Sequence, residues 1–152
     1  MSSHHRAADP GRLQAVLPDW PPGTVAILAT GAGNGPHAIP VSAAVRAGPR
    51  RVLIGLAATR GSLGRLRADP RVSLAIVAER VAVTAYGRAR VLDNAAVVEG
   101  VVAVEIEIER VEDHDRPAFE IESGVRWRWI DADADRRDAA VRAALARIAE
   151  DV

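Results

Sequence analysis

The sequence predicts a mainly β protein, an antiparallel β-barrel with helical decoration, and three observations predict it. Short runs rich in Val, Ile and Ala follow one another through residues 24–112, separated by turns of Gly, Pro, Asn and charged residues. Hydrophobic residues make up 49% of the chain but aromatic residues only 3%, so aliphatic side chains must fill the core. The connections between runs are short, which favours hairpins over crossovers. We therefore expect about six or seven strands in one antiparallel barrel.

Composition limits the class of protein. The 152 residues suit one domain over residues 9–152, after a polar stretch at residues 1–8 that we expect to be disordered. Basic and acidic residues number 20 each, and the basic residues are all arginine, so no basic excess points to nucleic acid. The absence of cysteine excludes disulfides and a thiol nucleophile. With no membrane-spanning apolar run and no signal-peptide core, we expect a cytoplasmic protein without a membrane partner.

The elements before the third strand are predicted from caps and apolar runs. Asp9 and Pro10 form a helix-start signal, and a short helix through residues 13–17 is expected to end before Pro18. Residues 24–30 form the first predicted strand, and residues 31–35 a Gly- and Asn-rich turn. Residues 37–46 form the second strand, in which Pro40 indicates a sheet edge or a bulge.

Four further strands are predicted over residues 51–57, 71–78, 81–92 and 101–112, with a tight turn at Glu79 and Arg80. The last of them alternates strictly, which is typical of a half-buried antiparallel strand. Its apolar face holds Val104, Ile106 and Ile108, and its polar face Glu105, Glu107 and Glu109. Because Arg88 and Arg90 alternate in the same way on the preceding strand, we interpret the glutamates as a solvated face and not as paired catalytic carboxylates.

A short helix over residues 62–67 separates the third and fourth strands and is stopped by Asp69-Pro70. Ser62 is well suited to be its N-cap. The junction at Arg60, Gly61 and Ser62 is a candidate phosphate pocket, because the backbone N–H groups of a helix start attract anions and Arg60 and Arg65 add positive charge. The alternative is that Ser62 only caps the helix and both arginines are solvated.

The C-terminal part is predicted to hold one more strand and a helix. Residues 124–130 read as the closing strand, presenting Trp127 and Trp129 on one side. Asp131 or Asp133 then caps a final helix, whose apolar positions recur at helical spacing. Those positions are Val141, Leu145, Ile148 and Val152.

No constellation of residues supplies protein-based catalysis or a metal site. The sequence lacks a Ser-His-Asp arrangement and paired histidines at metal-binding spacing, and His37 and His114 are isolated. The Gly-rich turn at residues 31–35 follows a strand, but no helix follows it, so we interpret it as a hairpin turn and not a dinucleotide loop. Any chemistry would therefore be carried by a bound cofactor.

The ordered set of TVAILAT, GPHAIPVSAAV, RRVLIGLAATRGSLGRLRADPRVSLAIV and VAVTAYGRARVL resembles the pyridoxamine 5′-phosphate oxidase-like, FMN-binding split-barrel proteins. The segment LRADPRV is its most specific piece, and the tail IESGVRWRWID is similar to the closing strand of short actinobacterial members. The resemblance implies a homodimer with FMN, or the deazaflavin coenzyme F-420, at the subunit interface. The phosphate would lie where the third strand meets the short helix.

The resemblance also implies a set of cofactor-binding residues. The ring would lie against the second and third strands, with the tryptophans approaching from the partner subunit; the alternative for the tryptophans is barrel or dimer core. The implied residues are Pro40, Val41, Ser42, Leu56, Ala57, Ala58, Thr59, Arg60, Gly61, Ser62, Arg65, Trp127 and Trp129.

Three departures from the family pattern bear on function. Ser62 stands where many members have a phosphate-binding lysine, Ile39 where the oxidases proper have an arginine, and residues 93–100 replace a helical insertion. Authentic pyridoxamine phosphate oxidation is therefore not expected. The sequence favours a flavin- or deazaflavin-dependent oxidoreductase acting on a small molecule by hydride transfer. A non-catalytic carrier of the same cofactor and a degenerate barrel without cofactor are the alternatives.

Overall fold

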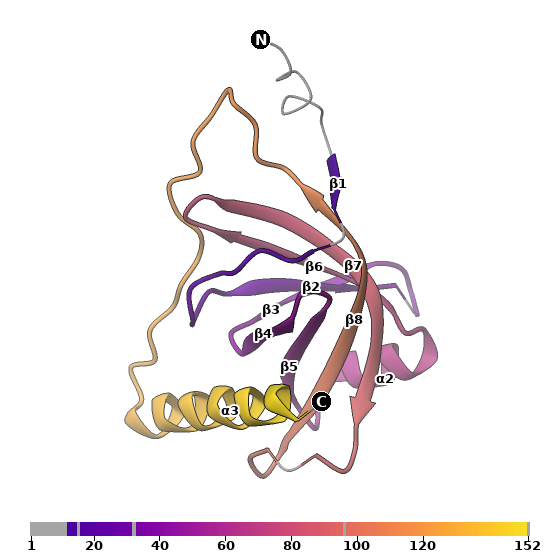
Figure 1. Cartoon of the computed structure of the whole chain (residues 1–152). Coiled ribbons are helices and arrows are strands. Elements are labelled where there is room, and N and C mark those ends of the chain that lie inside the picture. Colours follow the sequence, from indigo (N-terminus) through magenta and orange to yellow (C-terminus); the bar gives the residue numbers. More distant parts are fainter. Residues whose placement is uncertain (1–11, 15, 32, 96, 152) are drawn as a thin grey trace.

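The computed structural model describes residues 12–14, 16–31, 33–95 and 97–151 (Figure 1). The expected disorder of residues 1–8 lies outside them. The elements are β1 Arg12–Gln14, β2 Ala26–Thr30, β3 His37–Val41, β4 Ala44–Gly48, β5 Arg51–Ala57, α2 Gly61–Ala68, β6 Arg71–Ala78, β7 Val81–Leu92, β8 Val101–Asp113 and α3 Ala132–Glu150.

One antiparallel sheet dominates the molecule and curls into a half-barrel (Figure 1). The main strand order is β3-β2-β6-β7-β8-β5-β4, and β1 pairs with the far end of β8. The two outer strands of this order, β3 and β4, are joined only by Ser42 and Ala43. A two-residue link between opposite edges requires the sheet to curl until its edges approach each other. The mainly β, split-barrel fold that the sequence predicts is confirmed.

The second predicted strand, residues 37–46, is in fact two strands. β3 pairs with β2 through Ala26↔Val41 to Thr30↔His37, whereas β4 pairs with β5 through Ala44↔Ile54. The chain leaves one edge of the sheet and joins the other within Ser42 and Ala43, which an apolar pattern does not reveal. Pro40 lies in edge strand β3, as predicted, because an edge tolerates a residue without a backbone N–H.

The helix expected through residues 13–17 is not formed. Residues 12–14 form strand β1, which pairs with the end of β8 in the register Arg12↔Asp113 to Gln14↔Val111. The backbone hydrogen bonds offered by β8 therefore override the local helix-start signal. The capping residues Asp9 and Pro10 lie outside the described residues.

Most of the core lies inside the curl of the sheet, where Leu28, Ile54, Leu74, Ile76, Val104, Ile106 and Ile108 are fully buried. Val104, Ile106 and Ile108 are the predicted apolar face of β8. A smaller cluster on the outer side packs Leu53 and Ala103 against Val141 and Leu145 of α3. Gly55 permits this docking, because a Cβ there would come within 2.7 Å of a methyl of Val141.

The predicted closing strand at residues 124–130 is also wrong. This segment has no regular structure, and its chain runs down one side of the molecule toward α3 (Figure 1). Every side chain from Val125 to Ile130 is exposed, so the alternation of Arg and Trp does not separate an inside from an outside. Backbone contacts nevertheless fix its start, since Val25 N donates to Val125 O at 2.9 Å and Arg80 N to Ile121 O at 3.0 Å.

The other two predicted helices, at residues 62–67 and at the C-terminus, exist as α2 and α3, but the N-cap of α2 is not the expected one. Helix α3 begins at Ala132, and the side chain of Asp131 accepts a hydrogen bond from Asp133 N at 2.9 Å, which confirms Asp131 as N-cap. At α2 the N-cap is Arg60, with no side-chain cap, and Ser62 lies inside the first turn. Among the described residues, no helix is both long and apolar enough to cross a membrane.

Candidate functional site

Two adjoining hollows form where the β3–β4 link, the outer side of β5, residues 126–129 and α3 meet. Ser42, Trp129 and Asp138 line both. The first, about 400 Å³, is completed by Gly23, Arg126, Trp127, Arg128, Asp135 and Arg142. The second, about 290 Å³, is completed by Ala43, Gly55, Ala57, Val101, Ala134, Arg137 and Val141. We call the pair the seam site, because it lies at the seam between the outer strands.

Asp138 organises the middle of the seam site. Its Oδ1 accepts a hydrogen bond from Ser42 Oγ at 2.9 Å, and its Oδ2 lies 3.2 Å from Nε of Arg142, one helical turn later. The Asp138 side chain is only 13% exposed, so both contacts are largely shielded from water. The carboxylate thereby joins the β3–β4 link to α3 and fixes the direction of the Ser42 hydroxyl.

The two tryptophans form an aromatic wall of the seam site. Their ring centroids lie 5.9 Å apart at an interplanar angle of 70°, an edge-to-face pair. Trp127 and Trp129 are 43% and 38% exposed. The arginine between Val125 and Trp127 anchors this segment, since Nη1 of Arg126 donates to Pro22 O at 2.7 Å. Aromatic surface of this size, exposed beside a hollow, is suited to contact a planar ligand.

The predicted phosphate junction at Arg60, Gly61 and Ser62 follows the seam site closely along the chain. Ala57 ends β5 and lines the smaller hollow, and its carbonyl accepts a hydrogen bond from Arg60 N at 2.9 Å. Helix α2 begins directly after Arg60, which is exposed. The Ser62 side chain beneath the first turn is 1% exposed, and its hydroxyl has no hydrogen-bond partner in the part of the chain that the structure describes.

The structure brings together part of the predicted cofactor set. Ser42, Ala57, Trp127 and Trp129 line the seam site, and Ala58 and Thr59 connect it to Arg60 and Gly61 at α2.

The remaining members of the set lie elsewhere. Val41 and Leu56 belong to the buried core, and Pro40 is exposed on β3. The Arg65 side chain lies against the turn after β2, where a Cβ on Gly33 would be 3.2 Å from its Nη1.

Sequence reasoning missed Asp138 and Arg142. Their spacing of four residues on a predicted helix is a signal for an ion pair. Nothing in the sequence, however, indicates that α3 docks beside Ser42. Asp138 and Ser42 are 96 positions apart. That proximity arises only when the outer strands of the sheet meet.

Comparison with known proteins supports the fold. No protein-family model matches the sequence, and no curated protein matches it. A protein from Lactobacillus delbrueckii proposed to be a pyridoxamine 5′-phosphate oxidase is similar in structure, with a TM-score of 0.52 and 18% identity over 58% of this chain and 83% of the other.

Two further structures extend the comparison. General Stress Protein 26 from Bacillus anthracis has a TM-score of 0.51 and 10% identity over 69% of this chain and 90% of that protein. An F-420 reductase has a TM-score of 0.50 and 10% identity over 59% and 89% of the two chains. Identities this low establish the architecture alone: the chain has the fold of the pyridoxamine 5′-phosphate oxidase-like split barrels.

Proposed function

We propose that this protein binds a flavin or deazaflavin, FMN or coenzyme F-420, with its ring at the seam site and its phosphate at the start of α2. The continuity between the two places carries the proposal. A hollow with an exposed aromatic wall ends at Ala57, three residues before the N-cap Arg60. FMN has the matching parts, since its planar ring would contact the aromatic wall and its phosphate, joined by a short chain, would reach the positive charge at Arg60.

The residues at both ends fit such a cofactor. At the phosphate end, the first turn of α2 has N–H groups without intrahelical partners, and the positive charge of Arg60 lies next to them. The buried hydroxyl of Ser62 is a donor that a phosphate oxygen would satisfy. At the ring end, the combined volume of the two hollows lies within the range of ligand pockets.

We further propose an oxidoreductase that acts on a small molecule, as a homodimer. The bound cofactor would supply hydride transfer. The chain would orient the ring through Ser42, whose hydroxyl is directed by Asp138, and would exclude water with Trp127 and Trp129. No lysine is present to hold the phosphate, so Arg60 takes that part. The competing hypothesis is that the barrel has lost its cofactor and binds none.

Titration of FMN, coenzyme F-420 and riboflavin into the protein, followed by the quenching of cofactor fluorescence, tests the proposal. We expect Arg60→Ala to weaken FMN binding by about 1.5–3 kcal/mol, roughly ten- to a hundredfold, because a charge-assisted bond to phosphate is lost. Riboflavin, which lacks the phosphate, should bind both proteins equally. Trp129→Leu should weaken FMN and riboflavin alike, by about 1 kcal/mol.

Arg147→Ala is the matched control, because Arg147 is an exposed arginine in the last turn of α3. It should leave all three affinities unchanged. Equal losses of FMN and riboflavin affinity in Arg60→Ala would contradict the phosphate site. No binding of any of the three ligands to the unmodified protein would favour the barrel without a cofactor.

A further inference from the structure

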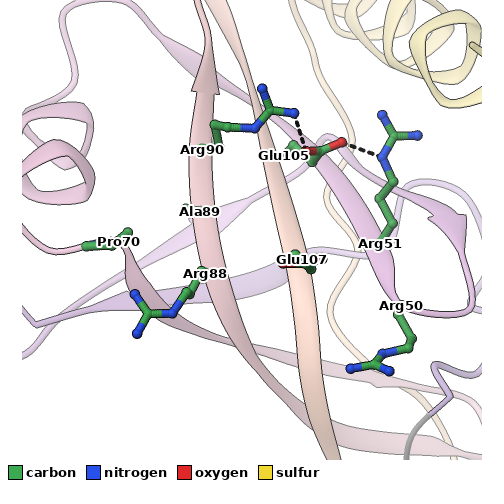
Figure 2. A pocket seen from close by; sticks show the side chains of 8 residues that line it. All are labelled: Arg50, Arg51, Pro70, Arg88, Ala89, Arg90, Glu105 and Glu107. Atoms are coloured by element: carbon green, nitrogen blue, oxygen red, sulfur yellow. Dashed lines mark hydrogen bonds and ion pairs between the residues drawn. The ribbon is translucent and has the colours of Figure 1, made fainter. Parts of the chain in front are cut away.

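A separate, charged hollow of about 550 Å³ lies on the outer face of β5, β8 and β7 (Figure 2). Its charged lining consists of four arginines and two glutamates: Arg50, Arg51, Arg88, Arg90, Glu105 and Glu107. We call it the arginine groove. None of its residues lines the seam site. On β5 the nearest lining residues of the two places are Arg51 and Gly55, so they are separated by about 13 Å along the strand.

Strand register places the arginines of the groove. Glu107 of β8 is opposite Arg88 on β7 and Arg51 on β5, and Glu105 is opposite Arg90. Arg50 immediately precedes β5. Figure 2 shows Arg88 and Arg90 on one side of β8 and Arg50 and Arg51 on the other. Positive charge therefore flanks β8 from both neighbouring strands.

The protein uses only part of the hydrogen-bonding capacity of these arginines. Arg50 donates through Nε to Ile108 O at 3.1 Å, Arg51 through Nε to Glu105 at 2.5 Å, and Arg88 pairs through Nε with Glu109 at 3.4 Å. Within the described residues, the Nη groups of these three arginines make no hydrogen bond. Each guanidinium is thus held in place by one nitrogen and keeps its paired donors for another molecule.

The charge balance of the groove favours an anion. Glu105 is shared, since its Oε1 also accepts from Nη2 of Arg90 at 2.7 Å. One carboxylate thereby satisfies part of two arginines. Glu107 is exposed and has no ion-pair partner among the residues described. With Glu109 pairing Arg88 beside the lining, four positive charges face three negative ones, and planar guanidinium groups match carboxylate and phosphate oxygens.

We infer that the arginine groove binds a small organic molecule with two or more anionic groups, carboxylate or phosphate, that bridges β7 and β5. Adjacent strands lie about 4.8 Å apart, so the two arginine rows are separated by about 10 Å and a single small anion reaches only one of them. A second copy of this chain fits less well. A symmetric dimer contact would place the same concave surface against itself and leave the hollow unfilled.

Isothermal titration of the full chain at low ionic strength tests this inference, with inorganic triphosphate, citrate and acetate as probes. We expect triphosphate and citrate to bind at one site per chain and acetate not to bind detectably. Tighter binding of triphosphate would identify a phosphate-bearing ligand, and tighter binding of citrate a polycarboxylate. These probes contain no flavin ring, so the result is independent of the cofactor proposal.

Variants on opposite sides of the groove sharpen the test. Arg88→Gln and Arg50→Gln should each weaken binding of the polyanions about five- to tenfold. Glu107→Gln should strengthen binding of the polyanions several-fold, because it removes a repulsive charge. If these residues had only a structural role, this substitution would not increase the affinity. Arg147→Gln, at an exposed position on α3, is the control and should change nothing.

Three results would overturn the inference. The first is no heat of binding for either polyanion at millimolar concentration. The second is an equal loss of affinity in Arg147→Gln, which would indicate general charge attraction. The third is a dimer that dissociates when Arg88 is changed to Gln, which would assign the groove to a second copy of the chain.

Discussion

At the scale of single residues, Glu105 is the carboxylate on which the outer face of the sheet depends. Its side chain is 16% exposed and contacts both Arg51 and Arg90. Partial burial raises the pKa of Glu105, but the hydrogen bonds from Arg51 and Arg90 lower it more, so the pKa lies below its ordinary value. The alternation of Glu and Arg in the sequence predicted a solvated charged face, and at Glu105 that face is an ordered ion-pair network.

Because of this pKa shift, the free energy of unfolding depends on pH. A carboxyl with a lowered pKa in the folded protein contributes stability that is fully present above its ordinary pKa, 4.5, and is lost as pH falls through the folded value. Glu105→Gln should therefore lower the free energy of unfolding at pH 7 by about 1–2 kcal/mol. Urea denaturation between pH 7 and pH 3 should show this deficit shrinking below pH 4.5. Glu109→Gln, exposed on the same strand, is the control, and a deficit that stays constant with pH would contradict the prediction.

The roles of two single residues, Ser62 and Gly124, could not be predicted from the sequence. Ser62 has the side chain of an N-cap, but the helix begins one residue earlier and the hydroxyl is buried in its first turn. Gly124 is required for a reason no local pattern carries, because a Cβ there would collide with the carbonyl of Val77. Both cases depend on which distant segment packs against the residue.

At the scale of elements, the strands with strong apolar patterns and clear turns were predictable. β5, β6 and β7 have the predicted bounds, and β8 extends one residue further. Burial on one or both faces of the sheet determines these strands, so the local pattern of apolar residues reveals them. β1 was not predictable, because its partner strand β8 comes much later in the sequence. The break between β3 and β4 was not predictable either, because the apolar pattern continues across it even though each strand pairs with its neighbour in the sequence. The seam site depends on that break, and so only some of its residues could be predicted.

Helix α3 is the element that completes the seam site, and its N-cap controls its stability. Asp131→Ala removes the bond to Asp133 N and should lower the free energy of unfolding by about 1 kcal/mol. Asp131→Asn keeps an acceptor and should restore most of that loss. Asp151→Ala at the opposite end of the helix provides the comparison, with little effect. Urea denaturation followed by circular dichroism measures all three, and equal losses for Asp131→Ala and Asp151→Ala would contradict the capping role.

At the scale of the whole molecule, the curled sheet arranges two separate surfaces around one core. The outer strands β3 and β4 meet at the seam site, where α3 covers part of the outer face. β5, β7 and β8 carry the arginine groove on the outer face. A third outer region, over β2 and β6, is apolar and exposed: Ile27 is 40% exposed, Val77 43%, and Val125 beside Val77 63%.

This apolar region leads to the prediction of a homodimer. Large apolar side chains exposed together on a sheet face favour association with a second copy of the chain. Size-exclusion chromatography with light scattering should give twice the chain mass of 16.1 kDa.

Val77→Glu should shift the protein toward the monomer, because a charge in an apolar contact must be desolvated without a partner. Ala143→Glu, exposed on α3, should remain dimeric. A monomer at micromolar concentration would contradict the dimer itself, whereas a Val77→Glu protein that stays dimeric would place the interface on another face.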